Sequence, residues 1–190
     1  LLQLDRQEEF ALALDWLLET IVAESIDVLL VSGDIFDIGN PPNQSRELYY
    51  NFLRRLLNSS CRHVIITGGN HDSPAMLNAP RELLAAFNIH IVGTATDQLE
   101  DELIVLKNKE NKAELVVAAV PFLRDRDLRI SRAGEAAQDR QDRLQEGLIS
   151  HYRELAKLAK PYKEKGLPVI AMGHLYAKGA VAADKQDNIY

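Results

Sequence analysis

The chain has 190 residues, a length that suits one α/β domain, or one domain with part of another. Its 46% of hydrophobic residues allow a sizeable core, and 28 acidic against 22 basic residues give a formal charge of −6. Proteins that hold nucleic acid through their own surface usually carry a basic patch, so charge alone favours an enzyme acting on small molecules. Bound metal ions remove this objection, because they supply positive charge locally.

The number of cysteines and the length of the apolar runs indicate in which cellular compartment the protein works. Cys61 is the only cysteine, so no intrachain disulfide can form, which fits a reducing cytoplasm. The longest apolar runs, such as residues 28–31, have the length of a strand, and we find neither a signal peptide nor a membrane span. We therefore expect a cytoplasmic protein with no membrane partner. Both ends look cut, since the chain opens at Leu1 and stops at Tyr190 without a tail.

Helix and strand patterns alternate along the first half of the chain. Asp5 as N-cap and Glu8 three residues later predict a helix start. Continuous apolar runs predict strands that are buried on both faces. The expected elements, in chain order, are helix 5–23, strand 27–32, helix 44–57, strand 63–67, helix 81–87 and strand 89–92.

The pattern changes after residue 103. Two apolar runs flank the polar residues 107–114, which predicts a hairpin. An arginine-bearing loop follows Pro121. The expected elements of this half are strands 103–106 and 115–120, a long polar helix at 135–160 and a strand at 167–172. Together the elements predict one α/β domain with a mixed sheet.

Three glycine-led motifs each follow a predicted strand, at residues 33–37, 68–72 and 173–174. Because the carboxyl ends of strands form the ligand crevice of open α/β sheets, motifs that are far apart in sequence can converge there. Asp34, Asn70 and His174 offer a carboxylate, an amide oxygen and an imidazole, a set that suits Mn²⁺-like ions.

Each of these residues also has an ordinary structural interpretation. An aspartate after a strand is often a turn cap, Gly-Asn is a common turn pair, and a lone histidine is more often packed than a ligand. His63, His90 and His151 lie within strand or helix patterns, and for them we keep the structural interpretation. The conjunction of three strand ends, three glycines and three polar groups favours a site.

Taken together, the motifs resemble the signature of the calcineurin-like metallophosphoesterases. The matching residues are Gly33-Asp34-x-x-Asp37, Gly69-Asn70-His71-Asp72 and Gly173-His174. Further stretches are similar to the SbcD-type family of bacterial nuclease subunits, at residues 14–18, 39–42, 121–127, 173–175 and 179–180. The resemblance covers essentially the whole chain and implies a sandwich of two mixed β-sheets flanked by helices, truncated at both ends.

The resemblance implies a role for each matching residue. Asp34 would bridge two Mn²⁺ ions in the intact protein, and Asn70 and His174 would bind the second of them. His71 would orient the scissile phosphate and protonate the leaving oxygen, with Asp72 supporting His71. In the same way, Asp37 would line the phosphate site without binding metal directly.

The sequence departs from the family pattern in two places. The family's first-strand Asp-x-His is absent, because Asp15-Trp16-Leu17 has leucine where histidine is needed and lies in a helix pattern. The later Gly-His-x-His is absent too, as are the capping domain and the segment that contacts the ATPase. We therefore expect residues 1–190 to be an incomplete nuclease domain that is nearly inactive alone and holds at most one ion tightly.

The resemblance implies that the intact protein is a Mn²⁺-dependent DNA exonuclease and endonuclease. It would process double-strand breaks and hairpins as a homodimer with an ATPase partner of the SbcC type. The arginines at 124, 126, 129 and 132 could contact DNA, but Asp125 and Asp127 alternate with them, which is equally typical of a self-paired surface loop. Two alternatives stay open: a phosphoesterase acting on small molecules or phosphoproteins, and a non-catalytic interaction module of the same fold.

Overall fold

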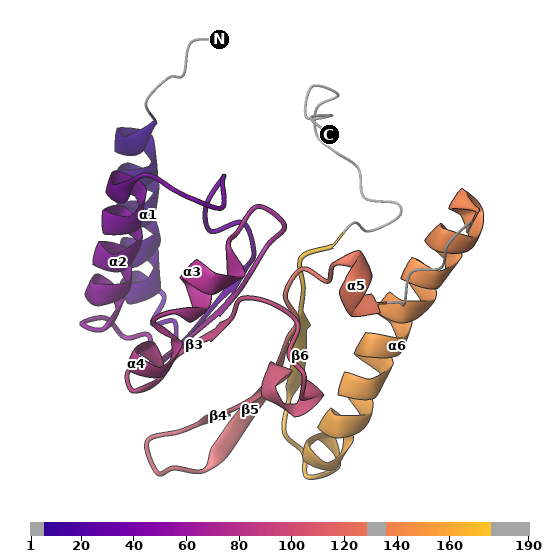
Figure 1. Cartoon of the computed structure of the whole chain (residues 1–190). Coiled ribbons are helices and arrows are strands. Elements are labelled where there is room, and N and C mark those ends of the chain that lie inside the picture. The colour runs from indigo at the N-terminus through magenta and orange to yellow at the C-terminus, as the bar shows by residue number, and fades with distance from the viewer. Residues whose placement is uncertain (1–5, 129–135, 176–190) are drawn as a thin grey trace.

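The computed structural model describes residues 6–128 and 136–175, which form two three-stranded sheets with helices on their outer sides (Figure 1). This arrangement confirms the predicted α/β class. The elements in chain order are α1 (Gln7–Ala23), β1 (Val28–Ser32), α2 (Asn43–Leu56), β2 (His63–Thr67), α3 (Pro74–Asn78), α4 (Arg81–Ala85), β3 (Ile89–Val92), the 3₁₀ helix η1 (Leu99–Glu102), β4 (Leu103–Lys107), β5 (Ala113–Ala119), α5 (Asp125–Leu128), α6 (Ala137–Glu164) and β6 (Val169–Met172).

The first sheet has the order β1-β2-β3, and its three described strands run parallel. Ser32 at the end of β1 lies opposite Thr67 at the end of β2, and Thr67 in turn lies opposite Val92. The carboxyl ends of these strands therefore share one edge, so the loops after β1 and β2 start side by side. Every residue of β2 is buried, as its continuous apolar pattern predicts.

The second sheet, in the order β4-β5-β6, is mixed. β4 and β5 form the predicted antiparallel hairpin, and β6 returns parallel to β5 after the long crossover helix α6. The expectation of two mixed sheets is thus right for this sheet, whereas the described part of the first sheet is parallel. The reason lies in the connections, because helices link the strands of the first sheet and a helical crossover returns the chain in the same direction.

The core fills the space between and around the two sheets. Ile65 and Val92 of the first sheet pack with Leu106 and Val117 of the second. α1 and α2 cover the outer face of the first sheet, and α6 covers the second through residues such as Leu155. Figure 1 shows α1 and α2 on the far side of the sandwich from α6. The predicted face-to-face sandwich with helices outside is confirmed.

Several element boundaries differ from the sequence expectation. α1 begins at Gln7, and Arg6 at its N-cap makes no side-chain capping bond, while Asp5 lies outside the described residues. The short helices α3, η1 and α5 were not predicted, because one turn leaves no periodic pattern to detect. α6 runs to Glu164, beyond the expected end at residue 160, with Pro161 in its last turn.

The three histidines assigned a structural role stand apart from the strand-end motifs. His63 is buried and donates from Nε2 to the carbonyl oxygen of Lys107 at 2.8 Å. Burial lowers the pKa of His90, and the neighbouring His63 adds to this effect. His151 Nε2 lies 2.7 Å from a carboxylate oxygen of the fully buried Glu102.

Within the described ranges, no helix has the length and apolar character that a membrane crossing requires.

Candidate functional site

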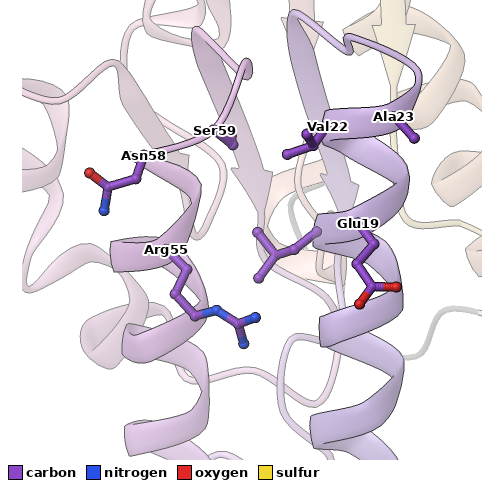
Figure 2. Close-up of a pocket in the computed structure, with 7 residues that line it drawn as sticks. Glu19, Val22, Ala23, Arg55, Asn58 and Ser59 are labelled. Carbon is purple, nitrogen blue, oxygen red and sulfur yellow. The ribbon is translucent and has the colours of Figure 1, made fainter.

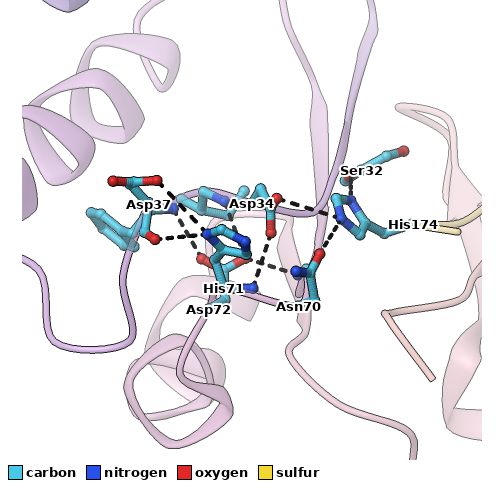
Figure 3. Close-up of polar contacts among 10 residues, drawn as sticks. Ser32, Asp34, Asp37, Asn70, His71, Asp72 and His174 are labelled. Atoms are coloured by element: carbon cyan, nitrogen blue, oxygen red, sulfur yellow. Dashed lines mark hydrogen bonds and ion pairs between the residues drawn. The ribbon is translucent and has the colours of Figure 1, made fainter. Parts of the chain in front are cut away.

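The three strand-end motifs meet in one cleft beyond the carboxyl ends of β1, β2 and β6, where α/β sheets commonly bind ligands (Figure 3). The cleft has a volume of about 480 Å³. Its lining brings together the predicted Asp34, Asp37, Asn70, His71 and His174 with Phe122, Gly173 and Leu175. Residues from opposite ends of the sequence thus converge, as the strand-end argument predicts.

Two glycines make this convergence sterically possible. A Cβ atom on Gly33 would lie 2.4 Å from Nδ1 of His174, and Gly33 itself has a positive φ of 79°. A Cβ atom on Gly69 would lie 2.2 Å from the backbone nitrogen of Asp34. Asp34 also adopts a positive φ, 46°, which costs a non-glycine residue on the order of 1 kcal/mol. Backbone strain at the predicted bridging ligand fits a functional position.

Asp34, Asn70 and His174 direct electron-pair donors at one another. His174 Nε2 lies 2.9 Å from Asn70 Oδ1 and 3.5 Å from Asp34 Oδ2. His174 Nδ1 lies 3.0 Å from the carbonyl oxygen of Ser32, which can only accept, so the neutral ring carries its proton on Nδ1. Nε2 then presents a lone pair to two oxygens. Three lone-pair atoms facing one another match the donor set of a cation site.

The bond to Ser32 is also typical of a metal-binding histidine, which usually donates its second ring N–H to a carbonyl or carboxylate. The set contains one carboxylate, one imidazole and one amide oxygen. In the part of the chain that the structure describes, no group of three His, Cys, Asp or Glu side chains could hold a metal. The amide oxygen of Asn70 is therefore an essential member of this candidate centre.

His71 lies beside these donors, and its ring is oriented by the first loop. Its Nδ1 donates to the carbonyl oxygen of Asp37 at 2.8 Å, and Oδ1 of Asp37 lies 3.7 Å from the same nitrogen. Its backbone N–H donates to Oδ1 of Asp34 at 3.2 Å. Since the carboxylate of Asp37 is 96% exposed, water screens its attraction for the ring, and the carbonyl bond is the main orienting contact.

Asp72 ties the two glycine-led loops together. Its buried carboxylate accepts from the backbone N–H groups of Ile35 at 3.1 Å, Phe36 at 2.9 Å and Gly69 at 2.8 Å. Hydrogen bonds to a charged group contribute roughly 1.5–3 kcal/mol each, so this clamp is a strong local contact. Both carboxylate oxygens are used by these amides. These bonds hold the loops that carry Asp34 and His71, and the support of His71 by Asp72 stays a prediction.

Sequence reasoning missed two contributors to the cleft. The ring of Phe122 packs edge-on against His174, with centroids 6.2 Å apart, and its backbone N–H donates to the carbonyl oxygen of Gly68 at 2.7 Å. The carbonyl of Ser32 orients the same histidine. Phe122 follows β5, so its position after a buried strand was an available signal. A backbone carbonyl leaves no mark in the sequence.

The described part of the arginine loop, residues 124–128, contains the short helix α5, and its charged side chains pair with one another and with neighbouring elements. The backbone N–H of Arg124 donates to Oδ2 of Asp127 at 2.8 Å, and Nη1 of Arg124 lies 3.5 Å from Oγ1 of Thr94. Arg126 is 75% exposed and lies 3.7 Å from Asp127. These pairs support the structural interpretation of the loop. The predicted residues at 129 and 132 lie outside the described ranges.

A second hollow, of about 510 Å³, lies between the carboxyl-terminal turns of α1 and α2 (Figure 2). Its lining is mainly apolar, with Glu19 on one helix and Arg55 on the other. Arg55 is already paired with Asp15. This hollow is a groove between packed helices, and the strand-end cleft remains the candidate site.

Comparison with known proteins agrees with this geometry. The chain is 36% identical over 186 residues to the SbcD component of nuclease SbcCD from Escherichia coli, covering 97% of this chain and 45% of that protein. It is 32% identical over 169 residues to the SbcD component of the nuclease from Rhodobacter capsulatus, covering 86% and 41%. It is 26% identical over 125 residues to the DNA double-strand break repair protein Mre11 of Sulfurisphaera tokodaii, covering 53% and 32%.

The chain thus spans less than half the length of these curated relatives. The family model described as calcineurin-like phosphoesterase matches residues 7–188, a range that includes all three motifs of the cleft. The chain therefore belongs to the calcineurin-like phosphoesterase family.

Proposed function

We propose that this chain is part of a metal-dependent nuclease that hydrolyses DNA phosphodiester bonds in break and hairpin processing. The observation that carries the proposal is the convergence of Asp34, Asn70 and His174 around one point, with His71 beside them. The names of the relatives, a nuclease component and a break-repair protein, support DNA as the substrate.

Asp34, Asn70 and His174 would hold a divalent ion, and we propose Mn²⁺ because mixed oxygen and imidazole donors suit it better than thiolate-preferring metals. When bound, such ions supply positive charge that activates water and offsets charge on the phosphate oxygens. The intact protein would hold two ions, with Asp34 shared between them. The described residues supply the ligands of only one of these two ion sites.

The remaining cleft residues would act on the phosphate. His71 would face the scissile group and pass a proton to the leaving oxygen, since a positioned imidazole is the commonest proton donor in such steps. The Asp37 carbonyl would keep its ring in that orientation. Asp72 would hold both loops in register, so that the carboxylate of Asp34 and the ring of His71 keep their spacing.

The alternative of a phosphoesterase for small molecules draws support from the net charge of −6. Assaying the full-length protein with Mn²⁺ on linear duplex DNA and on a small aryl phosphate separates the two. We expect DNA cleavage to be much the faster reaction. Fast aryl phosphate hydrolysis with intact DNA would identify the alternative. Metal binding without either activity would identify a non-catalytic interaction module.

We also propose an ATPase partner of the SbcC type, a homodimeric assembly and a cytoplasmic location. The partner follows from the name of the similar nuclease, SbcCD. A protein contact is further supported by Leu12 and Trp16, four residues apart on α1, which are both more than half exposed. The cytoplasmic location rests on the lone Cys61, which is partly buried and has a pKa raised by burial.

Contact between the arginine loop and DNA remains a separate proposal. If Arg124 and Arg126 bind phosphates, replacing both with alanine will weaken DNA binding. The slope of log affinity against log salt concentration will become shallower by the amount expected for the loss of about two phosphate contacts. The double replacement of Arg54 and Arg55 on α2 is the matched control. An unchanged salt slope in the Arg124 and Arg126 variant would leave the loop as self-paired surface.

A further inference from the structure

The long helix α6 reaches the candidate site through one tyrosine. The hydroxyl of Tyr152 donates to the carbonyl oxygen of Met172 at 3.3 Å. A Cβ atom on Gly173 would lie only 2.0 Å from that hydroxyl oxygen. The Tyr152 hydroxyl therefore sits directly against the peptide between Met172 and Gly173, one residue before His174.

The turn of α6 that carries Tyr152 is firmly anchored. His151 lies 2.7 Å from one oxygen of Glu102, which is fully buried, and the other oxygen of Glu102 accepts from the backbone N–H of Thr96 at 3.1 Å. One turn later, Leu155 is buried against the second sheet. Burial, followed by the charge of Glu102, raises the pKa of the Tyr152 hydroxyl, so it stays a protonated donor at neutral pH.

His174 is held from its other side by contacts of its own ring. Nδ1 bonds to the Ser32 carbonyl, and the Phe122 ring packs edge-on against the imidazole. These contacts fix the ring plane but leave the backbone of β6 to set how far the ring extends into the cleft. β6 is paired with β5, whereas Ile170 and Ala171 are exposed. At the end of this strand, Met172 is paired with Ala119 of β5 on one side, and its carbonyl oxygen accepts from the Tyr152 hydroxyl.

We infer that Tyr152 is a positioning residue for His174. From α6, on the outer side of the second sheet, it sets how far Nε2 of His174 reaches toward Asp34 and Asn70, which follow strands of the first sheet. The inference rests on the proposed function, because it treats His174 as a metal ligand. Partners that orient a metal-binding histidine typically change metal affinity by about 10–100-fold. A tyrosine acting through one backbone carbonyl is expected at the lower end of that range.

The test measures Mn²⁺ affinity by calorimetry, with the melting temperature of the metal-free protein measured in parallel. Tyr152→Phe keeps the ring and removes the hydroxyl, and we expect about tenfold weaker binding. Tyr162→Phe is the matched control, because Tyr162 lies in the last turn of the same helix, where the chain enters β6 at the end remote from His174. It should bind Mn²⁺ like the wild type. If the wild type fails to bind Mn²⁺, the proposed function itself is wrong. If the wild type binds and Tyr152→Phe binds equally well, only the positioning role is wrong.

A second variant keeps the test decisive if Tyr152→Phe also lowers the melting temperature. Gly173→Ala places a methyl group against the hydroxyl oxygen, and without that oxygen the nearest Tyr152 atom would lie 3.3 Å away. We therefore expect Gly173→Ala to weaken Mn²⁺ binding less in the Tyr152→Phe background than in the wild type. Equal losses in the two backgrounds would overturn the inference, because they would show that the two positions are not coupled.

Discussion

Replacing His71 with alanine in the full-length protein is expected to slow DNA cleavage by about 10²–10⁴-fold while the metal content stays unchanged. Loss of one positioned proton donor has an effect of this size. Metal should still bind, because the donors that converge in the cleft belong to Asp34, Asn70 and His174. The measurement combines single-turnover cleavage of linear duplex DNA with the metal content of the purified variant.

The contacts of His71 explain why its replacement should lower the cleavage rate without lowering the metal content. The ring Nδ1 of His71 bonds to the carbonyl of Asp37, which is not one of the proposed metal ligands. The backbone N–H of His71, which alanine retains, bonds to the carboxylate of Asp34. The substitution therefore removes the ring while leaving the loop contact in place. Loss of metal along with activity would instead make His71 a ligand.

His90→Ala is the matched control for removing an imidazole. His90 lies in β3 and takes no part in the lining of the cleft, so the variant should cleave DNA at the wild-type rate. Near-normal cleavage by His71→Ala, with unchanged metal content, would remove His71 from the mechanism.

Much of the fold followed from apolar runs and turn residues. The strands at 28–32, 63–67 and 89–92 agree with prediction to within one residue, because strands of parallel sheets leave continuous apolar stretches. Their burial agrees less well, since β2 is fully buried whereas β1 is only partly buried. α5 did not follow, since four residues give no helical period and their alternating charges suit a loop equally well. The end of α6 was predicted too early, at residue 160. The helix continues through Pro161 to Glu164, because a proline in the last turn removes only one backbone bond near an end that frays.

The location of the candidate site was predictable, but its internal bonds were not. Asp34, Asn70 and His174 each follow a strand. Register within the first sheet brings Asp34 and Asn70 together, and packing of the second sheet against the first brings His174 to them. Which atoms meet depends on backbone details that residue types do not reveal. The positive φ of Asp34 and the three amides bound by Asp72 are such details. The same holds for Tyr152, which lies within a polar helix and contacts the site through a carbonyl.

Titration of this chain with Mn²⁺, with and without His174→Ala, tests the metal centre most directly. Residues that only orient a metal ligand change affinity by at most roughly 100-fold. Among the described residues, His174 supplies one of the three protein donors at the candidate centre, so its loss should weaken binding by more than that. Asp34→Ala should act in the same direction, since it removes the only carboxylate of the three. His90→Ala, outside the cleft, should bind like the wild type.

Calorimetry gives both stoichiometry and affinity in that experiment. We predict one tightly held Mn²⁺ per chain, lost in His174→Ala and Asp34→Ala while each variant keeps its folded far-ultraviolet spectrum. Two tightly held ions per chain, or one ion whose affinity is unchanged in His174→Ala, would contradict the assignment of Asp34, Asn70 and His174 as the metal centre.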